Sequence, residues 1–419
     1  MNTRTISNRI QTMTDVAGPV MRYLQDRRWD ERKKDPEASD FSLGNPHELP
    51  LAGVTAALQK WAVPQNKDWF AYKMSEPESQ ELVAASLAKS HGLPFEPADI
   101  VMTTGAFAGL ATALGTIIDP GDEVIYISPP WFFYGMLVAS HYGTPVRVNC
   151  DPATFDLDIK AIRRAITPKT RGIIINSPNN PTGRIYPPDT LRRLAEVLTE
   201  ASHKNRRPIY LVSDESYSHI LYDNITYPSP TAYYAHSFLI YTFGKTLLAP
   251  GQRMGYVALP PAMPDRKTVR DGLLASMIAA GYVFPNALLQ HALGDLLKLS
   301  IDVRHLQGKR DRMVSALRRM GYEVHSPEGT FYLLVRSPLA DDEAFTELLA
   351  EQKVLCLPGA TFEMPGYFRI SLTANDAMID RALPGFEWAR QIAATMPEKK
   401  PRVRRVVKAK PRASRREAA

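Results

Sequence analysis

The chain has 419 residues, of which 44% are hydrophobic and 23% are charged. This length is enough for two domains with substantial cores, and the composition is ordinary for a soluble globular protein rather than a fibrous or disordered one. The formal net charge of +7 comes from the end of the chain, because residues 399–419 carry ten Lys or Arg and one Glu, and subtracting that +9 leaves −2 for the rest.

Neither end of the chain resembles a targeting or membrane segment. Residues 1–34 are polar and lack the unbroken apolar core of a signal peptide, and no later stretch approaches membrane-spanning length. Cys150 and Cys356 lie far apart without metal-ligand spacing. We therefore expect a cytoplasmic protein with no membrane attachment and no metal site. The basic tail, residues 396–419, is expected to be disordered; a solubilising extension is the simpler interpretation, and binding to nucleic acid or an acidic partner is the alternative.

The N-terminal third contains one local signal for anion binding. Residues 1–40 are expected to form a polar, helix-capable arm that ends at the turn Phe41–Pro46. A helix is expected over Ser79–His91, after the aromatic segment Asp68–Tyr72. The run Ile100–Gly109 then passes from a strand through a small-residue turn into a helix. The first N–H groups of that helix would bind an anion.

The middle of the chain alternates apolar runs with helical patterns. The expected strands are Glu123–Trp131, Pro145–Val148, Gly172–Asn176, Pro208–Asp214 and Phe238–Thr242, and the expected helices are Asp158–Ile166 and Pro188–Ser202. This alternation is typical of an α/β fold with a parallel sheet and crossover helices.

Polar residues follow several of these strands. Asn180 lies in a two-proline turn after one strand, and Asp214 ends the next, where its carboxylate is placed to face a cationic group. Lys245 and, eight residues later, Arg253 follow the strand that ends at Thr242. A lysine behind a buried strand is costly to leave charged and unpaired, so it has a partner or serves as a nucleophile. A surface lysine in a loop is the alternative.

The last part of the chain has a different pattern of expected helices and strands. Its expected elements are a charged helix over Ile301–Met320, strands at Gly321–Val324 and Thr330–Arg336, and a helix near Asp342–Gln352. They predict a smaller α+β domain that closes over the larger one. Arg369, between apolar neighbours on the last strand, needs a carboxylate, which its planar guanidinium binds through two parallel hydrogen bonds. A structural Arg–Asp pair is the alternative.

Together these motifs resemble the class I/II aminotransferases, which are aspartate aminotransferase-like enzymes of fold type I that use pyridoxal phosphate (PLP). Thr242-x-x-Lys245 followed by Arg253-x-Gly-Tyr is similar to the family's lysine motif, and Asn180-Pro-Thr-Gly is similar to its asparagine loop. The resemblance implies a large domain with a mostly parallel seven-stranded sheet between helices, plus a smaller α+β domain. The expected limits are an arm belonging to the small domain at 1–44, the PLP-binding domain at 45–295, the small domain at 296–395 and the tail at 396–419.

The same resemblance implies a role for each motif. Lys245 would form a Schiff base with PLP, Asp214 would keep the pyridine nitrogen protonated, and Tyr217 would donate to the phenolic oxygen. The remaining cofactor contacts would be Gly105, Ala106, Phe107, Thr242 and Arg253 at the phosphate, Tyr72 from the other subunit of a homodimer, Asn180 at the phenolic oxygen and Trp131 on the ring. The substrate contacts would be Gly44, Trp131, Asn180 and Arg369, with Arg369 on the α-carboxylate. The alternatives are core packing for Trp131, a turn glycine at Gly44 and a helix-capping Asp214.

The reaction implied is ping-pong transamination from an L-amino acid to a 2-oxo acid. Ser276–Phe284 contains no Arg or Lys, and Phe107 is apolar where dual-specificity relatives carry a basic group, so a neutral, aromatic or aliphatic substrate is favoured over aspartate. Another PLP reaction on this fold (β-lyase, decarboxylase or amino-acid synthase) is the alternative. A non-catalytic PLP-binding regulator is less favoured, because the first 40 residues are too short for a DNA-binding domain. Glu363 replaces a family glycine and is expected to reshape the loop over the substrate.

Overall fold

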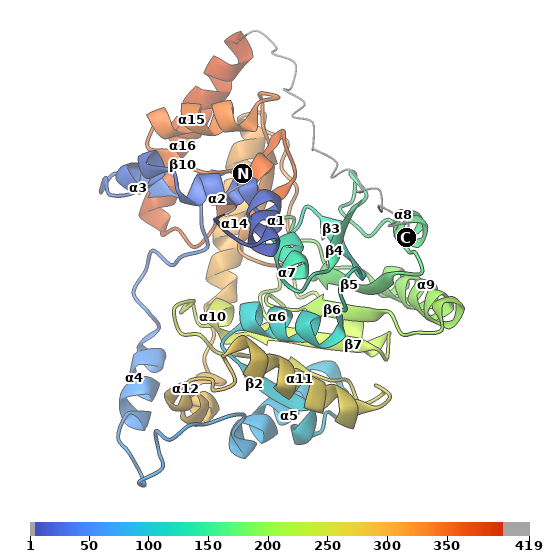
Figure 1. Ribbon diagram of the computed structural model, residues 1–419. Helices are drawn as coiled ribbons and strands as arrows, with labels where there is room; N and C mark the ends of the chain where they lie inside the picture. Colours follow the sequence, from blue (N-terminus) through green and yellow to red (C-terminus); the bar gives the residue numbers. More distant parts are fainter. Residues whose placement is uncertain (1–4, 397–419) are drawn as a thin grey trace.

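The structure is a computed structural model that describes residues 5–396. The chain forms a larger part around one central sheet and a smaller part in which the N-terminal arm lies beside the C-terminal third (Figure 1). The basic tail expected at 396–419 lies outside the described residues, except for Met396. Within residues 5–396, no helix combines the length and the apolar content that crossing a membrane requires.

Seven strands form the central sheet. In spatial order they are β2 (Ile100–Thr103), β8 (Gly255–Ala258), β7 (Ser237–Thr242), β6 (Tyr210–Asp214), β5 (Thr170–Asn176), β3 (Glu123–Ser128) and β4 (Thr144–Asn149). β8 is antiparallel to both of its neighbours and all other pairs are parallel, which confirms the predicted α/β fold. Parallel strands end at one edge, so Asn176, Asp214 and Thr242 come together at the carboxyl ends of β5, β6 and β7.

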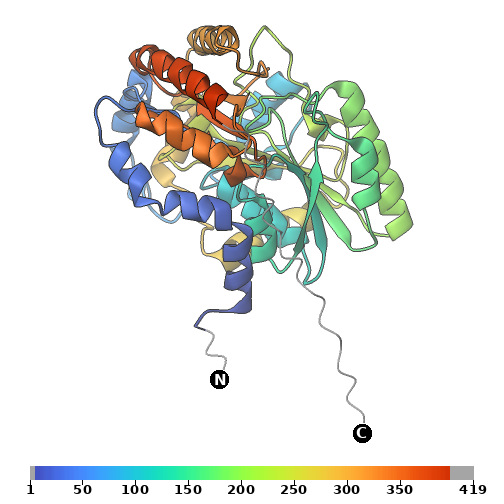
Figure 2. The ribbon, with the colours of Figure 1, turned by 90° about the horizontal axis from the view of Figure 1, so that it is seen from above.

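Helices cover both faces of this sheet (Figure 2). The helices of the larger part are α4 (Ala52–Trp61), α5 (Pro77–His91), α6 (Ala106–Ile117), α7 (Tyr134–Ser140), α8 (Ile159–Ala165), α9 (Pro188–Asn205), α10 (Phe243–Thr246), α11 (Arg266–Ala280), α12 (Ala287–His291) and α13 (Leu293–Leu296). Ile174 of β5 packs with Leu110 of α6 on one face, whereas Ile173 and Ile175 pack with Leu194 of α9 on the other. A strand buried on both faces needs a continuous apolar run, and β5 supplies it.

The smaller part has its own sheet and core. Its elements are α14 (Val303–Arg319), β9 (Tyr332–Arg336), α15 (Asp342–Glu351), β10 (Val354–Leu355), β11 (Leu357–Pro358), η3 (Gly359–Phe362), β12 (Tyr367–Ser371) and α16 (Asp376–Thr395). β12 pairs antiparallel with β11 and β9. The strand predicted at Gly321–Val324 is wrong, because only Val324 forms a bridge, to Val335. Gly321 has φ +84° at the end of α14 and Pro327 follows, which leaves too short a segment for a ladder.

The N-terminal arm contacts both parts. It contains α1 (Asn8–Val16), α2 (Gly18–Leu24), α3 (Arg27–Arg32) and β1 (Ser39–Asp40). β1 pairs in parallel with β10 of the smaller part. α1 packs on α7 of the larger part so closely that a Cβ at Gly135 would lie 2.8 Å from Cγ1 of Val16. The arm therefore connects the two parts across their boundary.

Candidate active site

A cavity of about 100 Å³ opens where the carboxyl ends of β5, β6 and β7 meet the start of α6. Its lining residues are Ala106, Phe107, Leu110, Trp131, Asn176, Asn180, Asp214, Ser216, Tyr217, Thr242, Lys245 and Arg253. A larger cavity of about 460 Å³ lies between the N-terminal arm and α15, but none of the residues with predicted chemistry lines it. The smaller cavity is therefore the candidate site because of the residues that line it, although its volume is lower.

Lys245 lies on the one-turn helix α10, directly after β7. Its Nζ is 5.6 Å from the ring centre of Tyr217 and 5.7 Å from that of Phe331. No carboxylate within residues 5–396 forms a salt bridge with this amine. The amine interacts with the carboxylate of Asp214 only through their charges at longer range. The lysine thus faces the cavity with its amine uncommitted, and the surface-loop alternative does not hold, because α10 lies against the cavity wall.

Asp214 ends β6 as a buried carboxylate. Burial raises the pKa of this carboxyl above its ordinary value, although hydrogen bonds from Ser216 and Tyr134 and the charge of Lys245 act in the opposite direction. The hydroxyls of Ser216 and Tyr134 each donate to it at 2.6 Å. A buried carboxylate held in this way is suited to a cationic partner.

One end of the cavity, formed by Gly105, Ala106 and Arg253, is called the phosphate end. Gly105 precedes α6 with φ +83°, and a Cβ there would lie 2.5 Å from Nη2 of Arg253, so only glycine fits. Arg253 donates to the carbonyl of Pro250 at 2.8 Å, and burial lowers the pKa of its guanidinium. Thr242 lies beside it and donates weakly, at 3.3 Å, to the carbonyl of Met254. A helix N-terminus beside a cation is suited to a phosphate.

Behind Asn180, which lines the cavity, Arg369 and the Ser42 carbonyl form a second polar group that is called the carboxylate end. Arg369 on β12 is only 2% exposed. Its Nη1 donates to Oδ1 of Asn180 and its Nη2 to the carbonyl of Ser42, both at 2.9 Å, while its buried Nε has no partner. Within residues 5–396 no Asp or Glu forms a salt bridge with it, so the structural Arg–Asp alternative does not hold. The amide NH2 of Asn180 remains for another partner.

Two tyrosines that the sequence analysis did not single out complete the polar wall. Tyr134, which begins α7, donates to Asp214. Tyr332, which begins β9, lies with its ring 4.0 Å from the guanidinium carbon of Arg369. Its hydroxyl also packs against Gly44, where a Cβ would lie 2.4 Å from Oη, so the glycine permits close backbone approach here. Tyr134 could have been noticed from its position three residues after Trp131; Tyr332 has no such local signal.

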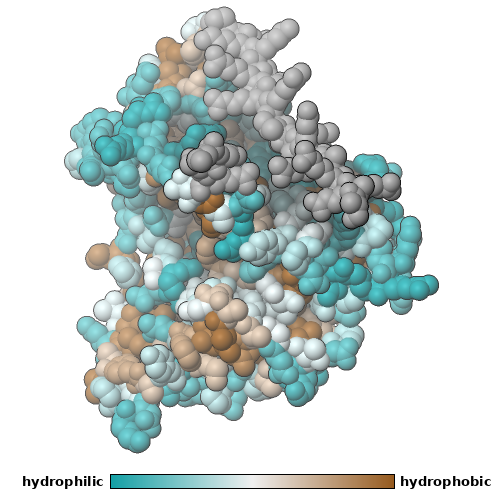
Figure 3. Space-filling view, viewed as in Figure 1, coloured by the Kyte–Doolittle hydropathy of each residue, from teal (hydrophilic) through white to brown (hydrophobic). Residues whose placement is uncertain are grey.

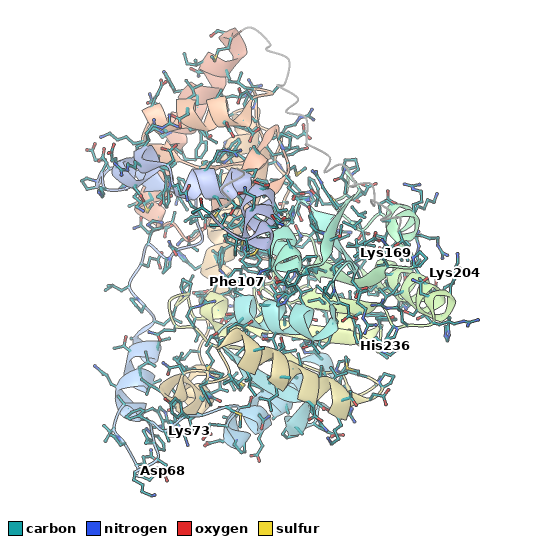
Figure 4. The ribbon with its side chains drawn as sticks, in the orientation of Figure 1. Asp68, Lys73, Phe107, Lys169, Lys204 and His236 are labelled. Carbon is teal, nitrogen blue, oxygen red and sulfur yellow. The ribbon has the colours of Figure 1, made fainter. Side chains whose placement is uncertain are left out.

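The remaining wall is aromatic. The ring of Phe107 lies edge-on to Trp131 at 5.0 Å and to Phe133 at 5.6 Å, and Trp131 contacts Tyr134 at 5.5 Å. Phe107 is at the start of α6, near the middle of the molecule (Figure 4). Trp131 therefore lines the cavity as expected, and Phe107 gives the wall next to it an apolar surface.

Four predicted site residues do not line this cavity: Gly105 and Arg369 contact residues that do, Gly44 packs on Tyr332, and Tyr72 lies elsewhere. Tyr72 is 86% exposed, and its ring contacts that of Phe284 at 4.8 Å. Its neighbours Asp68 and Lys73 lie at the lower tip of the molecule, far from Phe107 (Figure 4). Tyr72 therefore does not reach the site of its own chain.

Glu363 connects the two parts of the molecule. It has φ +61° at the end of η3, and its carboxylate accepts a hydrogen bond from Tyr126 at 2.8 Å and pairs with Arg147 at 3.2 Å. These contacts tie the smaller part to β3 and β4. These contacts form a polar connection between the two parts, and the reshaping of the loop over the substrate stays a prediction.

The residues present fit PLP. Arg253 and the start of α6 form a positively charged recess, which a Cβ at Gly105 would fill. Asp214 provides a buried anion for a ring nitrogen, and Lys245 provides a free amine. The unpartnered Nε of Arg369 leaves hydrogen-bonding capacity for a carboxylate. No group of side chains among the described residues has the composition of a metal site.

The sequence and the structure are similar to known proteins over most of their length. Residues 37–386 match the family model for aminotransferase class I and II. The aspartate/prephenate aminotransferase of Thermus thermophilus is 29% identical over 394 residues, covering 91% of this chain and 98% of that one; a probable enzyme of the same name from Thermus aquaticus is 30% identical and covers 93% and 100%. An aminotransferase of Eubacterium rectale has a TM-score of 0.83 at 29% identity, covering 93% of this chain and 96% of its own. The aspartate aminotransferase of Thermus thermophilus with maleate has a TM-score of 0.79 at 27% identity, covering 92% and 100%.

Proposed function

This chain belongs to the class I and II aminotransferase family, and we propose that it transfers the amino group of a neutral, aromatic or aliphatic L-amino acid to a 2-oxo acid. The resemblance inferred from sequence is confirmed, as are a PLP-dependent transaminase activity and a fold of type I. The choice of substrate and the roles of individual residues are proposals.

PLP supplies, when bound, an aldehyde that reacts with amines and a ring that accepts electrons. Arg253, Thr242 and the start of α6 would hold its phosphate, Asp214 its ring nitrogen, and Asn180 and Tyr217 its phenolic oxygen. Arg369 would bind the substrate α-carboxylate through its free Nε. Lys245, whose amine would hold the cofactor's aldehyde, would also move the proton between the substrate Cα and the cofactor's C4′ atom.

The covalent role of Lys245 can be tested directly. Borohydride reduction of the PLP-loaded protein, followed by peptide mass mapping, is expected to place the cofactor on Lys245. A Lys267→Ala variant, which removes an exposed lysine of α11, should give the same adduct. Modification of another lysine, or no visible absorbance at saturating PLP, would contradict the proposal.

The observation that carries the substrate preference is the apolar wall of Phe107 beside Trp131. The cationic residues that line the cavity are Lys245 and Arg253, to which other roles are assigned, with Arg369 behind Asn180. Two arginines of the arm are engaged elsewhere: Arg9 donates to the Ser140 carbonyl, and Arg32 pairs with Glu347. Among residues 5–396, a side-chain carboxylate in this cavity would thus meet aromatic rings and no cation without an assigned role, which disfavours it.

The names of the relatives support aspartate/prephenate aminotransfer as the second candidate. Single-turnover reactions of the PLP-loaded enzyme with a panel of amino acids, followed by loss of the cofactor absorbance, separate the two. We expect phenylalanine, leucine or alanine to react faster than aspartate. Faster reaction of aspartate would make the second candidate correct, and release of ammonia with pyruvate, or of carbon dioxide, would indicate another PLP reaction.

We further propose a homodimer in which Tyr72 reaches the phosphate of the partner's cofactor. Tyr72 and Phe284 form an exposed aromatic pair, and Leu274 and Ile278 of α11 are also exposed. Apolar side chains gather over α11 and its neighbours in Figure 3. Such a patch is typical of an interface. The two free cysteines, Cys150 and Cys356, are buried and support a reducing, cytoplasmic location.

A further inference from the structure

Ser42 is buried where the N-terminal arm meets the carboxylate end. Its carbonyl accepts a hydrogen bond from Nη2 of Arg369 at 2.9 Å. Its backbone N–H donates to Oδ1 of Asp40 at 2.9 Å, and its hydroxyl donates to the same oxygen. A carbonyl can orient a charged donor only when the backbone that carries it is itself held. The position of the Arg369 guanidinium therefore depends on how firmly Ser42 is held.

Trp29 of α3 supplies a further contact to Ser42. Its indole Nε1 donates to the Ser42 hydroxyl oxygen at 3.0 Å. Because that hydroxyl has already donated its only proton, its oxygen is free to accept. The indole is itself held, since Nζ of Lys33 lies 4.1 Å from its ring centre and the ring of Tyr23 lies 5.7 Å away. Hydrogen bonds thus connect a helix of the arm, through Ser42, to Arg369.

We propose that Trp29 is a positioning residue: by donating to Ser42 it holds the turn whose carbonyl orients Arg369 toward the α-carboxylate of the amino acid. The inference rests on the proposed role of Arg369. Trp29 does not line the candidate cavity, so it acts through Ser42. Hydrogen bonds in a connected network support one another, and a small displacement of a binding group is enough to weaken its hold on a substrate. The arm thus serves recognition of the substrate and not binding of the cofactor.

The PLP-loaded Trp29→Phe variant tests this, because it keeps an aromatic ring beside Tyr23 and removes the indole N–H. The KM of the preferred amino acid is expected to rise about fivefold, while kcat and PLP affinity stay within about twofold. The single-turnover rate with the amine that lacks only the carboxylate of that amino acid should not change, because such an amine offers Arg369 nothing to bind. Ser42→Ala, which keeps the carbonyl and removes the hydroxyl, should give the same pattern.

Trp61→Phe is the matched control, since this half-buried tryptophan donates its Nε1 to Asp295 at 2.8 Å, away from the candidate cavity. It should leave the KM unchanged. In the Arg369→Ala background, Trp29→Phe should cause no further loss, because Trp29 acts through Arg369. An unchanged KM in Trp29→Phe and Ser42→Ala, an equal loss with the amine, or full additivity with Arg369→Ala would overturn the inference. Absence of amino transfer by the unmodified protein would instead refute the proposed function.

Discussion

The phosphate end and the carboxylate end of the site both centre on an arginine, but they are built differently. Arg253 and Gly105 belong to neighbouring strands of one sheet, because Gly105 follows β2 and Arg253 precedes β8. Arg369 instead meets a carbonyl of the arm and an amide of the larger part, 327 and 189 residues away in sequence. One end is a feature of the larger part alone, and the other exists only when the two parts and the arm are together.

The largest effect that this difference predicts is in Arg369→Ala. The variant leaves the substrate carboxylate without its cation in a buried site, so kcat/KM is expected to fall about 1000-fold, while PLP affinity stays within about twofold because the phosphate end is separate. Steady-state kinetics and PLP titration measure the two quantities. Arg336→Ala, which removes an exposed arginine of β9, is the control. An equal loss of PLP affinity would show that the two ends are not independent.

Arg253→Ala is expected to affect PLP affinity strongly and the turnover of the amino acid only weakly, the reverse of Arg369→Ala. Removal of the cation beside the start of α6 is expected to weaken PLP binding about 100-fold. At saturating PLP, kcat for the preferred amino acid should stay within about fivefold, since the carboxylate end is intact. PLP dissociation constants from the visible absorbance, with kinetics at several PLP concentrations, measure both. Unchanged PLP affinity would remove Arg253 from the phosphate end.

The sequence predicted the phosphate end more completely than the carboxylate end, and the contacts explain why. Gly105 and the start of α6 are encoded in one short run, so the strand–turn–helix pattern was sufficient. Arg369 was recognised as a buried arginine that needs an anion, but Tyr332 was not, because its partners come from other segments. Tyr134 was missed for the same reason, since its acceptor Asp214 is 80 residues away.

Secondary structure shows the same contrast. The alternating strands and helices of the larger part were predicted because the central strands, such as β5, β6 and β7, contain continuous apolar runs that are buried. The predicted strand at Gly321–Val324 was wrong, because Gly321 and Pro327 limit it to one bridge. Periodicity could not reveal that limit, which depends on where β9 begins. Glu363 was noticed as a departure, but its connection to Arg147 required the structure.

Substitution of one glycine at each end tests whether the two ends act independently. Gly105→Ala would place a Cβ 2.5 Å from Arg253, at φ +83°, and is expected to weaken PLP binding about tenfold. Gly44→Ala would place a Cβ 2.4 Å from the Tyr332 hydroxyl, and is expected to raise the substrate KM about tenfold. Gly121→Ala, in open space but also at positive φ, controls for backbone strain alone. If Gly105→Ala instead raised the substrate KM and Gly44→Ala weakened PLP binding, the assignment of Gly105 to the phosphate end and of Gly44 to the carboxylate end would be wrong.

The smallest predicted effect concerns Asp214, which lies between the two ends. Its pKa in the folded protein is raised above the ordinary value of 3.8. The cofactor-free folded state therefore binds this proton more tightly than the unfolded state, and stability falls as pH rises from the unfolded value through the folded one. Asp214→Asn removes this cost, so at pH 7 its cofactor-free melting temperature should exceed that of the unmodified protein by about 2 °C. The difference should vanish near pH 3.

Thermal unfolding of both proteins across this pH range, with PLP removed, gives the measurement. Added PLP should reverse the order, because the carboxylate then gains the ring nitrogen as its partner. A cofactor-free Asp214→Asn that melts below the unmodified protein at pH 7 would show that Asp214 stabilises the fold on its own.

The hydrogen bond from Arg369 to the Ser42 carbonyl also has a consequence for biosynthesis. Ser42 is synthesised early and Arg369 much later. The Ser42 carbonyl therefore lacks its hydrogen-bond donor while the larger part, which lies between them in sequence, folds. The phosphate end needs no residue of this chain beyond Arg253, whereas the carboxylate end needs Arg369, which is synthesised later. Recognition of the substrate is therefore the last property that the polypeptide acquires.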